Sequence, residues 1–390
     1  MAIAEDLSLD QWVGRARALA PLVEQYRKEG EEERRLPHEL FVALRDEGLF
    51  GLWVPRILGG AETDVETSVR VVEELSRHDG SVGWNIMIAA NTSILWANLE
   101  PEVALEMTQG SPNTVIAGTV TAGSGTALPV PGGYRVNGRW PFASGCHQAD
   151  WLVSACNIVE DGEPRRGPGG APITYTFVLP ASECEILDTW HTVGMRATGS
   201  HDFCAHDLFV PEGRHFPSRS PGRIPGPLFN TSLFHLWAPN IAGVALGTAQ
   251  DAIDTFVSVA RTKRSVLRPD VLAEREAAQE KLGRADALVK SGRSFLLETI
   301  RETWALLSTG REVPEELTAR NRLAASNAVE SSVKAVDSLF ALAGTSSIYE
   351  GRLERCLRDV HVVQQHGVVN ASGFTTDGRC LLGLGLGPLR

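Results

Sequence analysis

Four long stretches of helix-forming sequence in the last part of the chain constrain the fold more than any other feature. They cover residues 238–262, 270–307, 314–342 and 353 to about 368, and each repeats its apolar residues with the period of about 3.6 that one buried helix face requires. Long amphipathic helices joined by short connections favour antiparallel neighbours. The sequence therefore predicts a helical bundle at the C-terminal end.

Residues 1–112 predict a second helical region at the start of the chain. Ser8 and Gln11 form a capping box, and Asp64 is a residue type typical of a helix N-cap. Residues 82–99 are apolar nearly all round, so the sequence predicts one buried helix there.

Residues 113–225 have a different composition, rich in valine, threonine, glycine and proline. Turn dipeptides separate short runs that favour strands, such as residues 174–178, at intervals of about ten residues. This spacing predicts a small β-barrel or sandwich. We therefore expect an α+β protein with an N-terminal α-helical domain (1–112), a central β domain (113–225) and a C-terminal helical bundle domain (226–390).

Composition excludes several classes of partner. The net charge is −11 and lysine and arginine form no long run, so neither nucleic acid nor an anionic membrane is expected as a partner. No stretch of eighteen uninterrupted apolar residues occurs, and the first ten residues lack the apolar core of a secretory signal. The six cysteines include no C-x-x-C pair, so no metal site is expected. We expect a cytoplasmic protein with reduced thiols.

The stretch from Gly138 to Trp151 suggests a place for a flat conjugated ring. It reads GRWPFASGCHQADW, so two aromatic residues, Trp140 and Phe142, stand beside Ser144 and Gly145. Aromatic side chains can wall such a ring, glycine lets the backbone approach it, and serine supplies a hydrogen bond. On residue types alone, a strand, a turn and a second strand with ordinary core aromatics explain the stretch at least as well.

The order of helices, strands and bundle resembles the acyl-CoA dehydrogenase fold. Five segments carry the resemblance: Leu58-Gly59-Gly60 after Pro55, Ala122-Gly123-Ser124, Gly194 to Ser200 (GMRATGS), Phe209-Val210-Pro211, and Ala260-Arg261. Each is a weak motif alone, and their shared order makes the resemblance specific. It implies a fold of the acyl-CoA dehydrogenase type, and a homotetramer in which the bundles pack together.

One departure from that family carries a functional prediction. Acyl-CoA dehydrogenases take a proton with a carboxylate that often follows an R-D-A sequence, whereas residues 360–367 after Arg358-Asp359 contain no glutamate and place His366 beside that position. With the Trp140 to Gly145 stretch, this resembles the two-component flavin-dependent monooxygenases built on the same fold. The resemblance implies hydroxylation of an indole-like or phenolic small molecule through a flavin C4a-hydroperoxide.

The same resemblance implies the cofactors and partners. Reduced flavin (FADH2 or FMNH2) and O2 are expected, with the flavin supplied by a separate NAD(P)H-dependent flavin reductase. The chain has no G-x-G-x-x-G strand–helix unit for a nicotinamide nucleotide, which fits that division.

Roles for individual residues follow from the resemblance and from side-chain chemistry. His366 and Ser144 are the expected catalytic residues: an imidazole with a pKa near 6.5 can hold either proton state, and the hydroxyl can accept from the reduced flavin N5–H. Flavin contacts are expected from Trp140, Ser144, Ser200, Arg261, Gly344 and Thr345, and substrate contacts from Trp84, Asn85, Phe234, Trp237 and His366. Of the flavin contacts, Arg261 is expected at the phosphate, and Gly344 and Thr345 at the nucleotide end across a subunit contact. His361, five residues earlier on the same expected helix, is offset by about 140° and is given no role.

Competing interpretations stay open at this point. Ser144 also fits a turn hydroxyl, Trp140 a core residue and Arg261 a solvated surface residue. The scaffold also supports N- or S-oxygenation, which stays an alternative to aromatic hydroxylation. An acyl-CoA dehydrogenase-like oxidoreductase with an unusual base and a catalytically silent ligand binder are the alternatives outside oxygenation.

Overall fold

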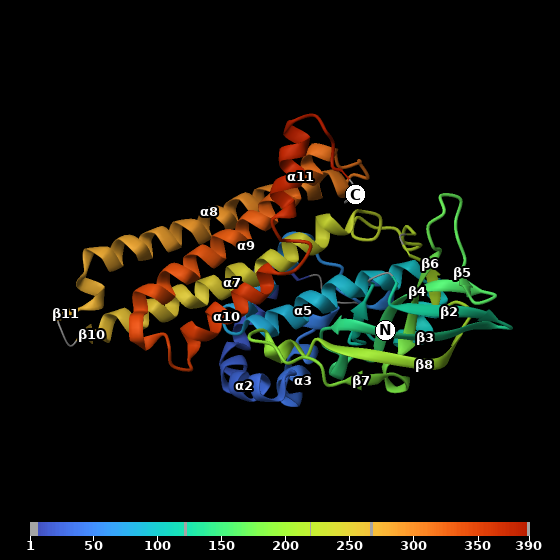
Figure 1. Cartoon of the computed structure of the whole chain (residues 1–390), viewed down its shortest axis with the longest axis horizontal. Coiled ribbons are helices and arrows are strands. Elements are labelled where there is room, and N and C mark those ends of the chain that lie inside the picture. The colour runs from blue at the N-terminus through green and yellow to red at the C-terminus, as the bar shows by residue number, and fades with distance from the viewer. Residues whose placement is uncertain (1–6, 121–122, 219, 266–267, 388–390) are drawn as a thin grey trace.

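The computed structural model of the chain describes residues 7–120, 123–218, 220–265 and 268–387. Its elements run from helices through strands to helices (Figure 1). The expectations that involve the first six residues and Ala122 lie outside the described residues. The first helices are α1 (Leu9–Ala18), α2 (Ala20–Glu33), α3 (His38–Asp46), α4 (Val65–Ser76), α5 (Gly80–Ser93) and α6 (Pro101–Thr108).

A mixed sheet follows these helices. Its strands are β1 (Ile116–Thr119), β2 (Gly125–Val130), β3 (Gly133–Ala143), β4 (Trp151–Glu160), β5 (Glu163–Pro164), β6 (Thr174–Pro180), β7 (Glu185–Leu187), β8 (His201–Pro211) and β9 (His215–Pro217). The main path runs β7-β8-β3-β2-β4-β6-β9, while β1 and β5 also pair with β4. β3 is antiparallel to β8, and their register shifts between Trp140 and Ala143, so β3 ends irregularly just before Ser144.

The remaining helices form the bundle. They are α7 (Leu233–Thr262), α8 (Glu276–Leu307), α9 (Glu315–Ala343), α10 (Arg352–Gln364) and α11 (Ser372–Leu381), with the short strands β10 (Arg264–Ser265) and β11 (Arg268–Val271) between α7 and α8. In Figure 1 the long helices α7, α8 and α9 lie side by side, and β10 and β11 lie at the end of the bundle farthest from the sheet. Among the described residues, no helix is both long and apolar enough to cross a membrane.

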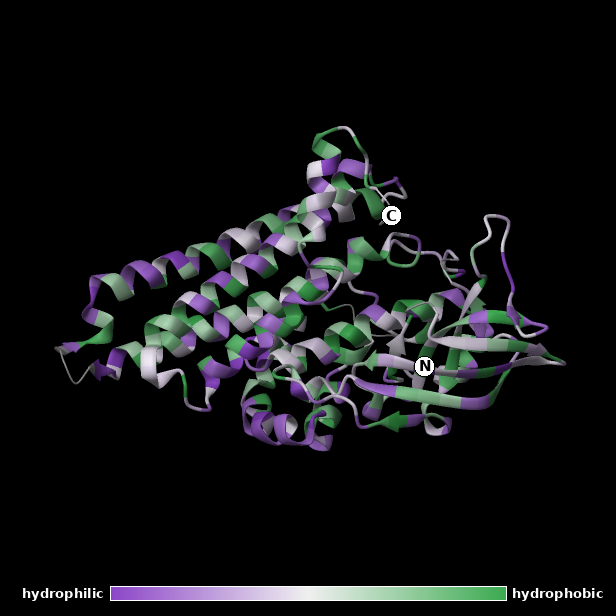
Figure 2. Cartoon of the chain, in the orientation of Figure 1, coloured by the Kyte–Doolittle hydropathy of each residue, from purple (hydrophilic) through white to green (hydrophobic). Residues whose placement is uncertain are grey.

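Two hydrophobic cores hold these parts together. One joins the first helices to the bundle, and it includes Trp12, Trp96 and Phe256. Figure 2 shows hydrophobic residues concentrated along α5 and α7, with a more mixed colouring on α8. The second core lies in the sheet around Trp140 and Phe203. The helices on both sides of the β region in sequence therefore share one interior, with α5 near its centre.

Side-chain caps explain the starts of α1, α4, α5 and α7. Ser8 completes the predicted capping box with Gln11, and the Asp64 side chain accepts from Thr67 N–H, as predicted from its residue type. Asp79 caps α5 by accepting from Ser81 N–H, so this helix begins before residue 82. It also ends before residue 99, because residues 94–98 tighten into a 3-10 helix.

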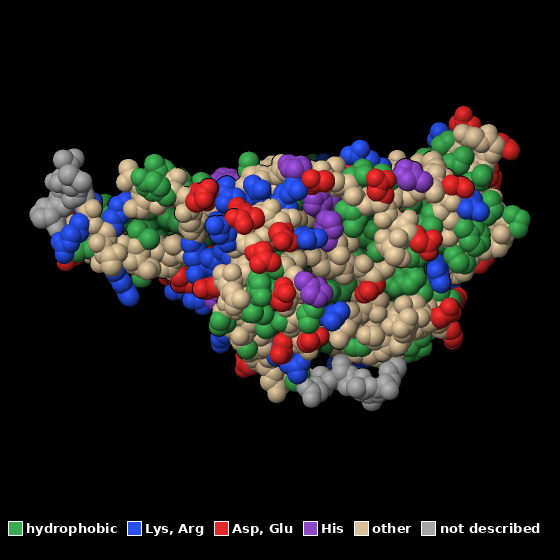
Figure 3. Space-filling view, turned by 90° about the horizontal axis from the view of Figure 1, so that it is seen from below, with side chains coloured by type: hydrophobic (Ala, Val, Ile, Leu, Met, Phe, Trp, Pro, Cys, Tyr) green, Lys and Arg blue, Asp and Glu red, His purple; other side chains and the backbone are tan. Residues whose placement is uncertain are grey.

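Three predicted boundaries in the bundle are wrong. α8 begins at Glu276 rather than residue 270, because β11 extends to Val271 and a 3-10 helix covers Leu272–Glu274. α7 begins at Leu233 rather than residue 238, because Ser232 caps it and Pro239 is carried inside the helix. α10 ends at Gln364 rather than near residue 368, so His366 lies in the turn beyond the helix. On the surface, Figure 3 shows acidic and basic side chains intermingled on the face seen from below.

Candidate active site

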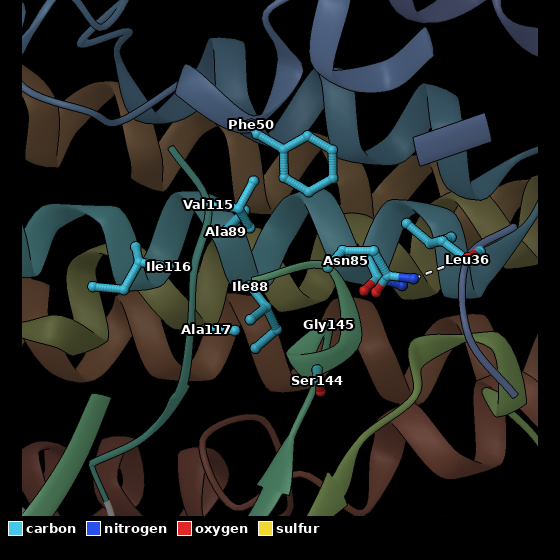
Figure 4. Close-up of a pocket in the computed structure, with 11 residues that line it drawn as sticks. Leu36, Phe50, Asn85, Ile88, Ala89, Val115, Ile116, Ala117, Ser144 and Gly145 are labelled. Carbon is cyan, nitrogen blue, oxygen red and sulfur yellow. Dashed lines mark hydrogen bonds between the residues drawn. The ribbon is translucent and has the colours of Figure 1, made fainter. Parts of the chain in front are cut away.

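The turn after β3 carries Ser144 and Gly145. Gly145 has a φ of 74°, and its N–H donates to Thr198 O at 2.9 Å, which ties the turn to the segment before β8. A Cβ atom on Gly145 would lie 3.0 Å from Asn85 Oδ1, so glycine lets the turn approach α5 closely. Figure 4 shows this turn lying against α5 beside Asn85. The turn is thus held between the sheet and the central helix.

Four side chains form a continuous hydrogen-bonded row at this turn. Trp84 Nε1 donates to Ser144 Oγ at 3.0 Å, and Ser144 Oγ lies 2.6 Å from Ser200 Oγ. Ser200 Oγ lies 2.6 Å from Thr198 Oγ1, whose hydroxyl donates to Met195 O at 2.8 Å. We call Trp84, Ser144, Ser200 and Thr198 the polar row. Its hydroxyl groups are buried and Trp84 is half-buried, so the row leads inward from α5.

His366 lies at the outer end of the polar row. The centroids of the His366 and Trp84 rings are 5.7 Å apart, with the rings tilted by 65°. The side chain is half-buried, and burial lowers the pKa of His366 from its ordinary value of 6.5. The structure therefore brings the two predicted catalytic residues together through one tryptophan ring, and it places a neutral imidazole there near pH 7.

The hydrogen bonds of His366 favour one tautomer. Val368 N–H donates to His366 Nδ1 at 3.3 Å, so Nδ1 acts as an acceptor and the proton of the neutral ring lies on Nε2. Among the described residues, Nε2 has no hydrogen-bond partner, and it can donate to a ligand. His361 remains on α10, where its Nε2 lies 2.8 Å from Asp337 Oδ1. The two histidines are thus separated by the helix end, not by an offset around one helix as predicted.

The aromatic residue that faces outward is Phe142, not Trp140. Trp140 is fully buried, stacks on Phe203 at 5.0 Å between centroids and donates from Nε1 to Ala155 O. No surface of Trp140 is left to pack against a flavin, so this predicted contact is wrong. Regular alternation would put both residues on one face, but the register shift and a φ of 63° at Phe142 turn its ring outward, to 65% exposure.

Asn85 serves a different purpose from the predicted substrate contact. Its amide nitrogen donates to Ser81 O at 2.9 Å and to Ala197 O at 3.2 Å, and the residue is only 4% exposed. These bonds fasten α5 to the segment that carries Thr198. The structure therefore assigns its amide donors to the framework of the site.

Phe234 and Trp237 lie on the first turns of α7. Trp237 Nε1 donates to Asn91 O at 3.2 Å, which attaches α7 to the far end of α5, two turns beyond Trp84. The Phe234 ring is half-buried and lies under the buried guanidinium of Arg322, with 4.5 Å between Arg322 Cζ and the ring centroid. Trp237 is therefore better placed than Phe234 to border a ligand that lies along α5.

The residues predicted to hold the nucleotide end of the flavin lie elsewhere. Arg261 is exposed at the end of α7, and Gly344 and Thr345 are exposed beyond α9. Lys263 Nζ donates to Ala343 O, so these segments are neighbours. Figure 1 places them at the end of the bundle away from the sheet. Within one chain the structure does not bring them together with Ser144.

A cluster of buried charged residues lies behind the polar row, and sequence reasoning missed it. The Asp359 carboxylate accepts from Met195 N–H at 2.5 Å, and Arg355 lies between Asp359 and Asp79, at 3.6 and 2.9 Å. Burial raises the pKa of Asp359 to about 6. We call Asp79, Arg355 and Asp359 the ion cluster. Arg358-Asp359 was available as a motif, but its contact with a segment 164 residues away was not readable from spacing.

The residues around Ser144 fit one edge of a reduced flavin. This edge has an N–H that needs an acceptor and a flat ring that needs an apolar surface. Ser144 Oγ supplies the oxygen, and the exposed Phe142 ring, with Trp190 edge-on at 6.3 Å, supplies an aromatic surface. The close approach of Gly145 to α5 leaves no side chain of its own in the way.

Comparison with known proteins identifies the family of the chain. The profile of the acyl-CoA dehydrogenase N-terminal domain matches residues 15–100, and that of the C-terminal domain matches residues 240–371. Indole-3-acetate monooxygenase of Pseudomonas putida is 30% identical over 356 residues, which cover 91% of this chain and 89% of the relative. The oxygenase subunit HsaA of a flavin-dependent monooxygenase from Mycobacterium tuberculosis is 28% identical over 359 residues, or 89% of each protein.

A solved structure gives the same result. XiaF from Streptomyces sp., determined in complex with FADH2 and glycerol, superposes with a TM-score of 0.90 and 30% identity, over 98% of this chain and 97% of that one. The predicted fold is confirmed. Because the matches extend over nearly its whole length, the chain belongs to the flavin-dependent monooxygenases of the acyl-CoA dehydrogenase fold.

Proposed function

We propose that this protein is the oxygenase component that hydroxylates a small aromatic molecule with reduced flavin and O2. One observation carries the proposal: Trp84 joins the Ser144 hydroxyl, by a hydrogen bond of 3.0 Å, to the neutral His366 ring, 5.7 Å away between centroids. The Ser144 hydroxyl, proposed for the cofactor, and the His366 imidazole, proposed for the substrate, thus both lie against the Trp84 ring. No carboxylate is needed in this arrangement, which separates it from α-proton abstraction by a dehydrogenase.

The cofactor supplies the oxidation chemistry in this proposal. Bound reduced flavin activates O2 and provides two electrons, so one oxygen atom enters the aromatic C–H bond and the other leaves as water. The balance is ArH + O2 + reduced flavin giving ArOH + H2O + oxidised flavin. The chain's own residues bind and orient the flavin and the substrate, and they exclude water from the site of reaction.

Ser144, Phe142 and Trp84 act on the cofactor side. Ser144 Oγ would accept a hydrogen bond from the N–H of the reduced cofactor, and the exposed Phe142 ring would offer an aromatic surface to its ring system. Trp84 keeps the Ser144 oxygen in place through its Nε1 donor and covers the space toward His366. Half-buried apolar residues of α5, among them Ile88, limit the access of water.

His366 acts on the substrate side as a hydrogen-bond donor. Because Val368 N–H occupies Nδ1, the Nε2–H group is the one available to a ligand. It suits an oxygen atom on the substrate, such as a phenolic hydroxyl, better than an indole N–H, which needs an acceptor. The relative named indole-3-acetate monooxygenase acts on a molecule that carries both a ring N–H and carboxylate oxygens. An oxygen-bearing aromatic substrate is therefore our first choice.

The flavin comes from a separate NAD(P)H-dependent flavin reductase in this proposal. The relative HsaA is named an oxygenase subunit, which implies a second component in its own system. Arg261, Gly344 and Thr345 bind the nucleotide end of a flavin held by another copy, since they lie far from Ser144 in their own chain. The active enzyme in this proposal therefore contains more than one copy of the chain, and we infer a homotetramer because the fold resemblance implies one. The six cysteines are free, so a cytoplasmic location suits the protein.

Rapid mixing tests the proposed function. The protein is mixed anaerobically with chemically reduced FMN or FAD, then with O2 and a panel of phenols and indoles, without any reductase. The expected result is a hydroxylated product from at least one panel member and much less product with His366→Ala. Formation of hydrogen peroxide alone with every compound would contradict the proposal. Oxidation of an acyl thioester in a parallel arm loaded with oxidised FAD, with reduction of that FAD, would favour a dehydrogenase.

A further inference from the structure

The polar row has a fixed direction of hydrogen donation. Trp84 Nε1 can only donate, and Met195 O can only accept, so the two ends of the row are determined by chemistry. Thr198 Oγ1 gives its one hydrogen to Met195 O. Ser200 must therefore donate to Thr198, and Ser144 must donate to Ser200, at 2.6 Å in each case.

With this direction of donation, the Ser144 hydroxyl can make one further hydrogen bond. Its hydrogen points to Ser200, and one of its two lone pairs accepts from Trp84. The other lone pair can only accept a further hydrogen bond. Reduced flavin has an N5–H that donates, whereas N5 of oxidised flavin only accepts. Ser144 can therefore pair with the reduced form and not with the oxidised form.

We propose that Thr198 and Ser200 are positioning residues that hold the Ser144 hydroxyl as an acceptor, so that the flavin pocket binds reduced flavin more tightly than oxidised flavin. This inference rests on the proposed function, because it assumes that Ser144 faces the flavin N5 edge. For an oxygenase that receives reduced flavin from another protein, such a preference favours loading before the reaction and release of flavin after it.

The row resists reversal because its inner end is anchored. Donation in the opposite direction would need Thr198 to give its hydrogen to Ser200 and to abandon Met195 O. Met195 is itself held at both polar groups: its N–H donates to Asp359, and its carbonyl also accepts from Trp190 Nε1 at 3.0 Å. The carbonyl therefore stays where Thr198 can reach it. Reversal costs about one neutral hydrogen bond, equivalent to a factor of about five in an equilibrium.

Two variants with a matched control test this inference through binding, not turnover. Thr198→Val removes the hydroxyl while it keeps the branched shape, and Ser200→Ala removes the next link. Thr198→Ser keeps the hydroxyl and is the control. Dissociation constants for oxidised and chemically reduced FMN and FAD are measured anaerobically for each protein, and the midpoint potential of the bound flavin is measured by spectroelectrochemistry.

In the wild type we expect reduced flavin to bind more tightly than oxidised flavin. Thr198→Val and Ser200→Ala are expected to lower the ratio of the dissociation constant for oxidised flavin to that for reduced flavin about fivefold. The reason is that the Ser144 hydrogen is then free to turn toward N5. For a two-electron couple, this corresponds to a fall of about 20 mV in the potential of the bound flavin. Thr198→Ser should keep the wild-type ratio. If Thr198→Val does not fold, Ser200→Ala gives the same test.

The outcomes separate this inference from the proposed function. An unchanged ratio in both Thr198→Val and Ser200→Ala, in a protein that still hydroxylates its substrate, overturns the inference alone. A wild type that binds neither form of flavin overturns both. A loss of affinity for both forms by the same factor would show a merely structural role for the row, and it would likewise overturn the inference.

Discussion

The polar row and the ion cluster are two sets of buried polar residues that meet at Met195 and differ in charge and in role. Both attach to Met195, the row at its carbonyl oxygen and the cluster at its N–H. The row carries no charge and ends at half-buried Trp84 beside His366. The cluster is charged, and its members Asp79, Arg355 and Asp359 are all buried. The comparison shows that neutral hydrogen-bonding groups lie beside His366, while the charged groups lie on the other side of Met195.

The physical reason lies in what each arrangement tolerates. A buried ion pair contributes little net stability, but removal of one partner leaves a charge without compensation. Removal of one member from a row of neutral hydroxyls breaks one or two hydrogen bonds and leaves no buried charge without compensation. The cluster is therefore suited to fix the backbone of residues 194–199, and the row is suited to present one oriented oxygen to a ligand.

The largest effect is expected on stability, from the ion cluster. Asp359→Ala removes the acceptor for Met195 N–H and leaves Arg355 with less compensation, so the free energy of unfolding should fall by about 3–5 kcal/mol. Asp337→Ala is the control, because its pair with His361 is exposed and should cost about 1 kcal/mol or less. Denaturant unfolding measures both. Equal losses in the two variants would erase the distinction between a buried framework and a surface pair.

The next effect is expected on rate, at the outer end of the row. His366→Ala removes the substrate's hydrogen-bond donor, so hydroxylation should slow by about 100-fold while flavin affinity changes little. His361→Ala should leave the rate within about twofold, because its Nε2 bonds Asp337 on the surface. Single-turnover product formation gives the rates. Full activity in His366→Ala would remove this residue from the mechanism.

A smaller effect is expected on coupling, from the middle of the row. Ser144→Ala leaves Trp84 Nε1 and Ser200 Oγ without their partner and removes the proposed acceptor for flavin N5–H. Each buried group left without a partner should lower the free energy of unfolding by about 1–3 kcal/mol. More of the O2 consumed should then be released as hydrogen peroxide without product. Ser291→Ala, on the exposed side of α8, is the control. The ratio of peroxide to product measures the change, and an unchanged ratio would deny Ser144 a place beside the flavin.

The smallest effect is expected from pH. The pKa of His366 is lowered in the folded protein, so between that value and 6.5 the unfolded chain binds more protons than the folded one. Stability should therefore decrease as pH falls through this window, and His366→Gln should remove part of the decrease. Protonation also places a hydrogen on Nδ1 against Val368 N–H, so kcat/KM should fall there, not at pH 7. Unfolding free energies of the two proteins from pH 8 to 5 measure the difference.

The sequence predicted the fold well because helix periodicity and turn chemistry are local. The long helices appear within a few residues of their expected bounds, and Ser8 and Asp64 cap as predicted. The errors lie where tertiary contacts decide. α7 begins at Leu233 instead of residue 238, α8 begins at Glu276 instead of residue 270, and α10 stops before His366.

The site was only partly predictable for the same reason. Ser144, His366, Ser200 and Trp84 were all predicted as site residues, and the structure places them together. The contacts that link them run from α5 to separate loops, so their arrangement was not predicted. Trp140 was expected to contact the flavin, but strand alternation puts Trp140 and Phe142 on one face and does not reveal the register shift that buries one and exposes the other. The ion cluster joins α5, α10 and residue 195, and no sequence spacing reports such a contact.

Isotope labelling of the transferred oxygen tests the central claim most directly. Wild-type protein loaded with chemically reduced flavin is mixed with 18O2 and an accepted phenol in ordinary water, with no reductase present, and the product is analysed by mass spectrometry after one turnover. The account predicts one 18O atom in each molecule of hydroxylated product, and little product from His366→Ala. A product whose new oxygen comes from water, or peroxide without product, would contradict it.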